Sequence, residues 1–367
     1  MQPARRMDQP TTPSAPSPST RLAITSDTPS PGPSPQAVQT LASLGASLGP
    51  ILHEACGDRL GDIEWFNSPW QRSGSSTGRT WWRLPSGEVI PAIVKAPVGY
   101  REWFWTTRLG EADPMMWDHD GDHALPVPRV LSSGLELGGY DLAWLVVERI
   151  PDHPLSKGMT RPSLDQLFRA AARFHRLAAD IQDPTKADPP PERRWTKLFE
   201  RSRESLVDNK VENASGWTRA LDAVDARLPM LVERWAARPM NTWCHGDLHP
   251  GNVMVRPETT DGLEASGVLI DLGLVHPGHW IEDALYLERL HWGREEMLCG
   301  LRPLLSLAQR RSELGFPAMS DEDARLAGIR RVLMAATSPA FLAEEGDPRY
   351  LAAALRHIET GLSQIPD

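Results

Sequence analysis

The sequence predicts a bilobal α+β protein in which a lobe built on an antiparallel sheet precedes a mostly helical lobe. Between residues 62 and 150, short apolar segments are separated by turns of small residues, which is typical of antiparallel strands. From residue 151 onward, apolar residues recur at helical spacing. We expect a tail at 1–36, an N-terminal sheet lobe at 37–150 and a C-terminal helical lobe at 151–367.

The N-terminal segment differs from the rest of the chain in composition. Residues 1–36 are rich in Pro, Ser and Thr. Such a segment buries too little apolar surface to offset the entropy lost on ordering, so it is predicted to be disordered. A helix is expected next, over residues 36–55, with an interruption near Gly45 and Gly49.

The strands of the sheet lobe are expected where apolar stretches are bounded by turn residues. They are 63–66, 79–84, 89–95, 129–137 and 142–150, with one short helix at 100–109. The last two strands are predicted to form a hairpin turned by Gly138 and Gly139.

Two segments of the helical lobe place their apolar residues on one helical face. These residues are Leu164, Leu167, Phe168, Ala171, His175 and Ala178 in the first segment, and Leu351, Ala354, Leu355, Ile358 and Leu362 in the second. Both segments are therefore predicted to be helices that pack on a core.

Composition excludes several classes of protein. The chain has 367 residues, of which 40% are hydrophobic, so it can form a substantial core. A net charge of −9 argues against non-specific nucleic-acid binding, which requires clustered Lys and Arg. The 3 scattered cysteines fit a reducing compartment better than a disulfide framework. Without an apolar run of ~18 residues or a signal-peptide core, we expect a cytoplasmic protein without membrane contact.

The most informative segment is a polar turn followed by an apolar run. It carries His245-x-Asp247-x-x-x-x-Asn252, and a second acid follows in Ile270-Asp271. Phosphoryl transfer needs a carboxylate that orients and deprotonates a hydroxyl, here Asp247. It also needs oxygen ligands for Mg²⁺, here Asn252 and Asp271. An ordinary polar turn would use the same residue types, but it would not require the second acid.

This pattern resembles the protein-kinase-like phosphotransferases that act on small molecules, in particular the aminoglycoside phosphotransferase and choline/fructosamine kinase group. The resemblance covers about residues 62–362. It implies a bilobal protein-kinase-like fold that binds ATP and Mg²⁺ and transfers the γ-phosphate to a hydroxyl of a small molecule. His245 would then be structural. Asp283 matches a residue that commonly braces the catalytic turn, although a simple charge at a helix N-terminus is an equal alternative.

The resemblance also assigns residues around the phosphates. Lys95, at a strand end, resembles the kinase lysine that contacts the α and β phosphates. Glu102 is its expected partner, and Glu111 is a rival because the spacing to Glu102 is short. The loop Ser73 to Gly78, which includes Ser75, is a candidate phosphate cover through backbone N–H groups, although it lacks the Gly-x-Gly-x-x-Gly spacing.

The adenine would lie farther along the sheet. Glu148 and Ile150 occupy the expected hinge, where adenine meets backbone groups. The acceptor is expected to bind in the regions 185–240 and 290–367, whose residues do not identify it.

Parts of the sequence are compatible with other functions. A metal hydrolase would use the cluster His245, Asp247, His249, His276 and His279, but it leaves Asn252 and Lys95 unexplained. The segment 118–122 resembles half of a Ca²⁺ loop and lacks the twelfth-position Glu. A catalytically inactive pseudokinase, acting as a nucleotide-binding or scaffold module, is the main alternative, but it typically loses one of the residues retained here.

Overall fold

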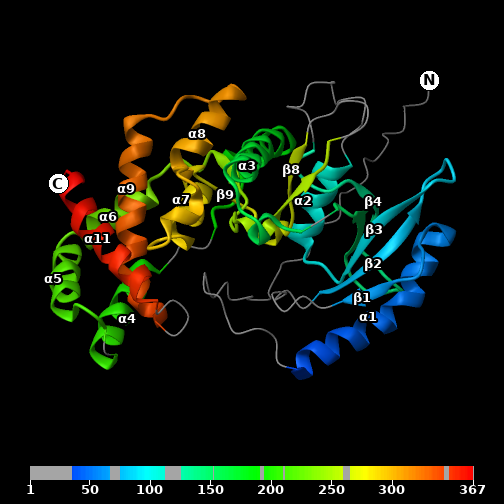
Figure 1. The fold of residues 1–367 in the computed structure, drawn as a ribbon, viewed down its shortest axis with the longest axis horizontal. Coiled ribbons are helices and arrows are strands. Elements are labelled where there is room, and N and C mark those ends of the chain that lie inside the picture. The colour runs from blue at the N-terminus through cyan, green and yellow to red at the C-terminus, as the bar shows by residue number, and fades with distance from the viewer. Residues whose placement is uncertain are drawn as a thin grey trace, which may run out of the picture.

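The structure is a computed structural model that describes residues 35–66, 75–111, 125–151, 153–190, 194–209, 211–258, 265–342 and 347–366. The predicted disordered tail lies outside these residues except for its last two, which begin the first helix. The segment 118–122 also lies outside them. A sheet lobe and a helical lobe lie side by side in Figure 1, so the predicted α+β class is confirmed. The domain boundaries at residues 36 and 150 stay predictions.

The sheet lobe contains five antiparallel strands in the order β1-β2-β3-β5-β4. The strands are β1 (Glu64–Phe66), β2 (Ser76–Arg83), β3 (Val89–Ala96), β4 (Val130–Gly134) and β5 (Trp144–Glu148). The predicted hairpin of β4 and β5 is confirmed, although both strands are shorter than expected. Gly138 and Gly139 turn it with φ values of 60° and 80°, which favour glycine.

Strand β2 begins earlier than the sequence predicted. Ser76, Thr77 and Gly78 already pair with Ala96, Lys95 and Val94 of β3, so the end of the predicted phosphate loop is strand. Small residues are needed there because a Cβ on Gly78 would lie 2.3 Å from a methyl carbon of Ile63.

Helix α1 (Pro35–Cys56) packs on one face of this sheet (Figure 1), and the predicted interruption is wrong. The helix continues through both glycines. A Cβ at Gly45 would lie 2.6 Å from the indole of Trp65, so this glycine permits close packing rather than ending the helix. Helix α2 (Tyr100–Gly110) lies between the sheet and the helical lobe.

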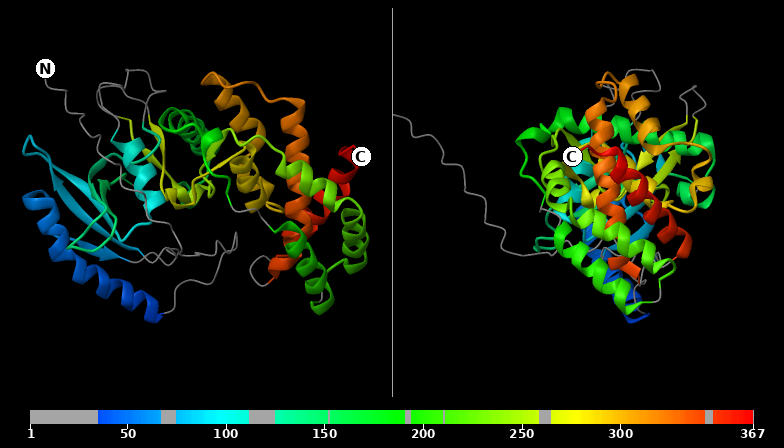
Figure 2. Two further views of the ribbon diagram at one scale, coloured as in Figure 1. Left: turned by 180° about the vertical axis from the view of Figure 1, so that it is seen from behind. Right: turned by 90° about the vertical axis from the view of Figure 1, so that its left-hand side faces the viewer.

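The helical lobe is built around α3 (Arg161–Ile181), whose predicted apolar face is buried. Thr160 and Ser163 form a capping box that begins this helix. The other helices are α4 (Trp195–Asp208), α5 (Ala214–Asp225), α6 (Leu228–Ala236), α7 (Ile281–Leu290), α8 (Pro303–Glu313), α9 (Asp321–Ala336) and α11 (Pro348–Gln364). Helix α11 packs along α9, as Figure 2 shows, and buries most of its predicted apolar face.

Two small ladders pack beside α3 and flank the polar residues of the motif. Strand β6 (Thr242–Cys244) pairs with β9 (His276–Gly278), and β7 (Val253–Arg256) pairs with β8 (Ser266–Leu269). Among the described helices, none is both long enough and apolar enough to cross a bilayer.

Candidate active site

The polar turn, residues 245–252, joins β6 to β7 and contains a position that only glycine fits. Gly246 has φ +83°, and a Cβ there would lie 2.3 Å from the carbonyl oxygen of Leu274. Both the conformation and the close approach exclude a side chain. The chain can therefore reverse directly before Asp247, which leaves that carboxylate 24% exposed.

His245 is completely buried and has the structural role that the sequence predicted. Its Nε2 lies 3.1 Å from the carbonyl oxygen of Ile270, so it connects the polar turn to the residue before Asp271. Its Nδ1 accepts the backbone N–H of Asp247 at 3.3 Å. This imidazole therefore fixes the relative positions of two acids without facing the solvent.

Asp283, at the start of α7, binds the backbone of the polar turn, and its contacts are called the brace below. Its carboxylate is fully buried and accepts the backbone N–H groups of His245 at 2.8 Å and Gly246 at 2.9 Å. Burial raises the pKa of Asp283, but the hydrogen bond from His175 and the other polar contacts outweigh burial and lower it. The carboxylate therefore stays ionised and satisfies donors that would otherwise be buried without partners.

The brace extends to helices α3 and α8. Arg311 donates through Nη1 to Nδ1 of His175 at 2.8 Å, and Nε2 of His175 lies 3.0 Å from Asp283. Because an arginine can only donate, Nδ1 of His175 is the acceptor and Nε2 carries the proton given to Asp283. Burial lowers the pKa of His175, which keeps it neutral in this arrangement.

The carboxylate of Asp247 is held by three side chains. Asn252 donates through Nδ2 to Oδ2 at 2.9 Å, and Nε2 of His249 lies 3.6 Å from the same oxygen. The hydroxyl of Tyr286, on α7, donates to Oδ1 at 2.5 Å. Burial raises the pKa of Asp247, but His249 and Tyr286 outweigh burial and lower it to about 2. Asp247 is therefore ionised at neutral pH.

Asn252 and Asp271 lie at the same end of the β7–β8 ladder. Val253 pairs with Leu269, and the backbone N–H of Ile270 donates to the carbonyl of Asn252 at 2.9 Å. Asp271 adopts φ +64°, a left-handed conformation that is unusual for a residue with a side chain and is concentrated at functional sites. Its side chain is 47% exposed, so its oxygens are accessible to a ligand.

Lys95 of β3 contacts the helical lobe directly. Its ammonium forms an ion pair with Glu102, and its Nζ lies 3.9 Å from Oδ1 of Asp271. Burial lowers the pKa of Lys95, but the carboxylates of Glu102 and Asp271 outweigh burial and raise it, so the lysine stays charged. The rival Glu111 instead accepts the hydroxyl of Ser133 at 3.5 Å on the exposed side of the sheet.

The remaining predicted nucleotide residues border the sheet. Ser75 is buried just before β2, two residues from the position that pairs with Lys95. Ile150 is buried just after β5. The side chain of Glu148 forms an ion pair with Arg256 of β7, and its backbone N–H donates to the carbonyl of Arg129 at 2.9 Å.

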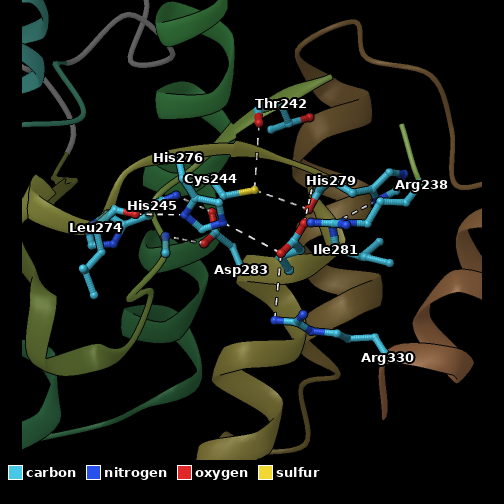
Figure 3. A network of polar contacts seen from close by, with 12 residues as sticks. Arg238, Thr242, Cys244, His245, Leu274, His276, His279, Ile281, Asp283 and Arg330 are labelled. Carbon is cyan, nitrogen blue, oxygen red and sulfur yellow. Dashed lines mark hydrogen bonds and ion pairs between the residues drawn. The ribbon is translucent and has the colours of Figure 1, made fainter. Parts of the chain in front are cut away.

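The five residues of the rival metal-hydrolase cluster do not converge. Among the described residues, one group has metal-ligand spacing, namely Cys244, His276 and Glu282, whose ligand atoms lie within 4.8 Å of one another. Arg238 already donates to Glu282 at 2.8 Å. Burial raises the pKa of Cys244, and its thiol donates to the carbonyl of His279 at 3.3 Å. Figure 3 shows Cys244 and His276 in a network of hydrogen bonds and ion pairs that also includes Arg238 and His279.

Sequence reasoning missed four residues that support the site. Tyr286 contacts Asp247, Arg256 contacts Glu148, and His175 and Arg311 extend the brace on Asp283. Only Tyr286 has a signal in the sequence, because it follows Asp283 by three residues and so shares its helical face.

The fold and the arrangement of these side chains define a class of protein. Lys95 of the antiparallel sheet pairs with Glu102 of a helix and lies 3.9 Å from Asp271. The polar turn with Asp247 and Asn252 precedes this acid in the chain. This combination is the bilobal, protein-kinase-like fold that the sequence predicted. The model of the phosphotransferase enzyme family matches residues 114–298, just over half of the chain, and the protein belongs to this family.

Two curated relatives are similar over part of their length. An aminoglycoside 3'-phosphotransferase of Streptomyces fradiae is 30% identical over 173 residues, which are 45% of this chain and 57% of that protein. The enzyme of the same name from Streptomyces ribosidificus is 31% identical over 158 residues, 41% of this chain and 54% of that protein. The chain thus spans little more than half the length of these relatives.

Solved structures extend over more of the chain at lower identity. The crystal structure of an aminoglycoside phosphotransferase from Alicyclobacillus acidocaldarius is 14% identical, with a TM-score of 0.48, and covers 94% of this chain and 96% of that one.

Proposed function

We propose that this protein is an ATP- and Mg²⁺-dependent phosphotransferase that transfers the γ-phosphate to a hydroxyl of a small molecule. The observation that carries the proposal is the contact between Lys95 of the sheet lobe and Asp271 of the helical lobe. Lys95 of the sheet, paired with Glu102, lies 3.9 Å from Asp271. Asp271 follows strand β8, and Asn252 directly precedes β7, the partner of β8. Lys95 would serve as the phosphate-binding cation, and Asn252 and Asp271 as oxygen ligands, near the ionised Asp247.

The donor set at this position fits Mg²⁺. Nδ2 of Asn252 is occupied by Asp247, so the opposite atom of the amide, Oδ1, is available as a ligand. Asp271 adds carboxylate oxygens, and hard cations prefer oxygen ligands of these two types. When bound, Mg²⁺ would neutralise charge on the phosphates.

The protein's own residues would then orient the reactants. Lys95 would bind the phosphates, and Asp247 would accept a hydrogen bond from the acceptor hydroxyl. In the reaction, a bond forms between the acceptor oxygen and the γ-phosphorus while the bond from that phosphorus to the β,γ-bridging oxygen breaks. ADP leaves with the electron pair, and the hydroxyl proton passes to Asp247. Because the transition state is loose, orientation and charge neutralisation supply most of the rate.

Aminoglycosides are the first acceptor class to test. Both curated relatives are named aminoglycoside 3'-phosphotransferases. The net charge of −9 is also compatible with a cationic acceptor.

The test is ADP release from Mg·ATP with a panel of aminoglycosides, with mass spectrometry of the acceptor. We expect an acceptor that gains one phosphate, with ADP release that depends on Mg²⁺ and is lost in Asp247→Ala. Nucleotide binding without transfer to any hydroxylated small molecule would instead support the alternative, an inactive pseudokinase.

A further inference from the structure

One helix supports both the backbone and the side chain at the centre of the polar turn. On α7, Asp283 accepts the backbone N–H groups of His245 and Gly246, and Tyr286, one turn later, donates to the carboxylate of Asp247. Residues three apart share a helical face, so the same surface of α7 fixes the path of the chain and the direction of the side chain.

The two oxygens of Asp247 have different surroundings. Oδ2 faces Asn252 at 2.9 Å and His249 at 3.6 Å. Among the described residues, Tyr286 is the one hydrogen-bond donor to Oδ1, at 2.5 Å. A carboxylate oxygen has two acceptor positions, so Oδ1 keeps one open after Tyr286 has bound, while both directions around Oδ2 are approached by side chains.

The contacts on Oδ2 come from the polar turn itself. The imidazole of His249 uses its Nδ1 to accept the backbone N–H of Gly251 at 3.0 Å, which directs Nε2 toward Asp247. Asn252 also donates to the backbone carbonyl of Asp247 at 3.0 Å. Tyr286 is thus the contact on this carboxylate that comes from a separate, packed helix, and it holds the oxygen opposite the one that Asn252 holds.

We propose that Tyr286 is a positioning residue that fixes the carboxylate of Asp247 so that Oδ1 is the oxygen that takes the proton of the acceptor hydroxyl. This inference rests on the proposed phosphotransferase function. It adds a residue outside the His-x-Asp-x-x-x-x-Asn motif to the reaction. Misdirection of a reacting group by about 1 Å costs up to about 100-fold in rate, so loss of one of three contacts is expected to cost about tenfold.

The test compares Tyr286→Phe with Tyr350→Phe. Tyr350 is a matched control because its hydroxyl also bonds to α7, through Nε of Arg289 at 3.0 Å, but it does not contact Asp247. With Mg·ATP and an aminoglycoside that bears a 3'-hydroxyl, we expect Tyr286→Phe to lower kcat about tenfold while both KM values stay within about twofold. Tyr350→Phe is expected to retain kcat. An unchanged kcat in Tyr286→Phe, or equal losses in both variants, would overturn the proposal.

A second measurement does not require turnover. Crystal structures of the wild type and both variants would report the orientation of the Asp247 carboxylate. We expect a single orientation in the wild type and in Tyr350→Phe, and a rotated or doubled one in Tyr286→Phe. The wild-type orientation retained in Tyr286→Phe would overturn the inference. A wild type that releases no ADP would contradict the proposed function, and the crystal structures would still decide whether Tyr286 orients Asp247.

Discussion

The polar turn and Lys95 lie on opposite sides of the site and are held by different kinds of interaction. The turn is fixed by backbone N–H groups that donate to Asp283, whose side chain is 0% exposed. Lys95 is held by two side-chain ion pairs, a buried one to Glu102 and a second one to Asp271, which is 47% exposed. Buried hydrogen bonds to a charge tolerate little movement, whereas an exposed ion pair exchanges partners readily.

This difference separates the two tasks of the site. In the proposed reaction, the polar turn would hold Asp247 in one orientation before any ligand binds. Asp271 would release Lys95 in part when Mg²⁺ and the phosphates bind. Variants of the turn are therefore expected to affect rate or folding, and variants around Lys95 to affect nucleotide affinity.

The largest expected effect is on the rate in Asp247→Ala. If Asp247 is the base, as proposed, its removal is expected to lower kcat by about 10³-fold or more while the affinity for ATP is nearly unchanged. ADP release and calorimetric titration of the same preparation measure both quantities. An equal loss of nucleotide binding would show that Asp247 does not act separately from the nucleotide site.

The next largest effect tests the brace. Asp283→Ala leaves two backbone N–H groups and His175 without their acceptor, and it is expected to lower the free energy of unfolding by about 3 kcal/mol. Asp222, exposed and paired with Arg203 at 2.9 Å, is the matched control, with an expected loss of less than about 1 kcal/mol in Asp222→Ala. Urea unfolding measures both. Similar values for the two variants would show that the buried carboxylate of Asp283 stabilises the turn no more than an exposed ion pair stabilises the surface.

A smaller effect, on nucleotide affinity, is expected for a variant of the residue that positions Lys95. Glu102→Gln removes one charge of the buried ion pair that positions Lys95, so it is expected to raise the Kd for Mg·ATP about fivefold and also to lower the free energy of unfolding. Glu111→Gln is the control, because Glu111 contacts Ser133 rather than Lys95. A Kd that rises equally in both variants would argue against Glu102 as the positioning partner.

The smallest effect is a change in the pH dependence of stability. Burial lowers the pKa of His175, so below about pH 6.5 the unfolded chain binds a proton that the native protein does not. Stability is therefore lost as pH falls from about 6.5 toward the native pKa, by at most about 1.4 kcal/mol per pH unit. In His175→Gln this contribution disappears, and unfolding free energies measured between pH 7 and 5 should fall less steeply than in wild type.

His276 is the control, because its pKa is shifted in the opposite direction from that of His175. Burial lowers its pKa, but the hydrogen bond with Glu282 outweighs burial and raises it. Its contribution is present below about pH 6.5 and is lost as pH rises through the native pKa. His276→Gln should therefore make the free energy of unfolding fall more steeply as pH decreases from 7 to 5. If this slope changes in the same direction in His175→Gln and His276→Gln, the opposite pKa shifts assigned to the two histidines are wrong.

The parts of the site that could be predicted were those encoded by local spacing. Asp247, Asn252 and Asp271 belong to one turn and the ladder after it, and Lys95 ends a strand with an apolar pattern. The side chains that orient them come from distant parts of the chain. Tyr286 meets Asp247 across 39 residues, and Arg311 meets His175 across 136. Such contacts depend on the packing of whole helices, which periodicity does not specify.

The errors in the predicted fold have the same cause. Gly45 was expected to interrupt α1, and its propensity supports that expectation. In the structure the indole of Trp65, from a strand that follows later in the chain, packs against the glycine and the helix continues. Tertiary packing therefore determined the outcome where local propensity suggested a break.

The most direct test of the account is calorimetric titration of ATP, with and without Mg²⁺, into wild type and Asp271→Ala. The account predicts Mg²⁺-dependent binding by the wild type and a clear loss of that dependence in the variant, because Asp271 supplies exposed carboxylate oxygens beside Lys95. Equal Mg²⁺-dependent affinity in both proteins would contradict the assignment of Asp271, and no binding by folded wild type would contradict the nucleotide site itself.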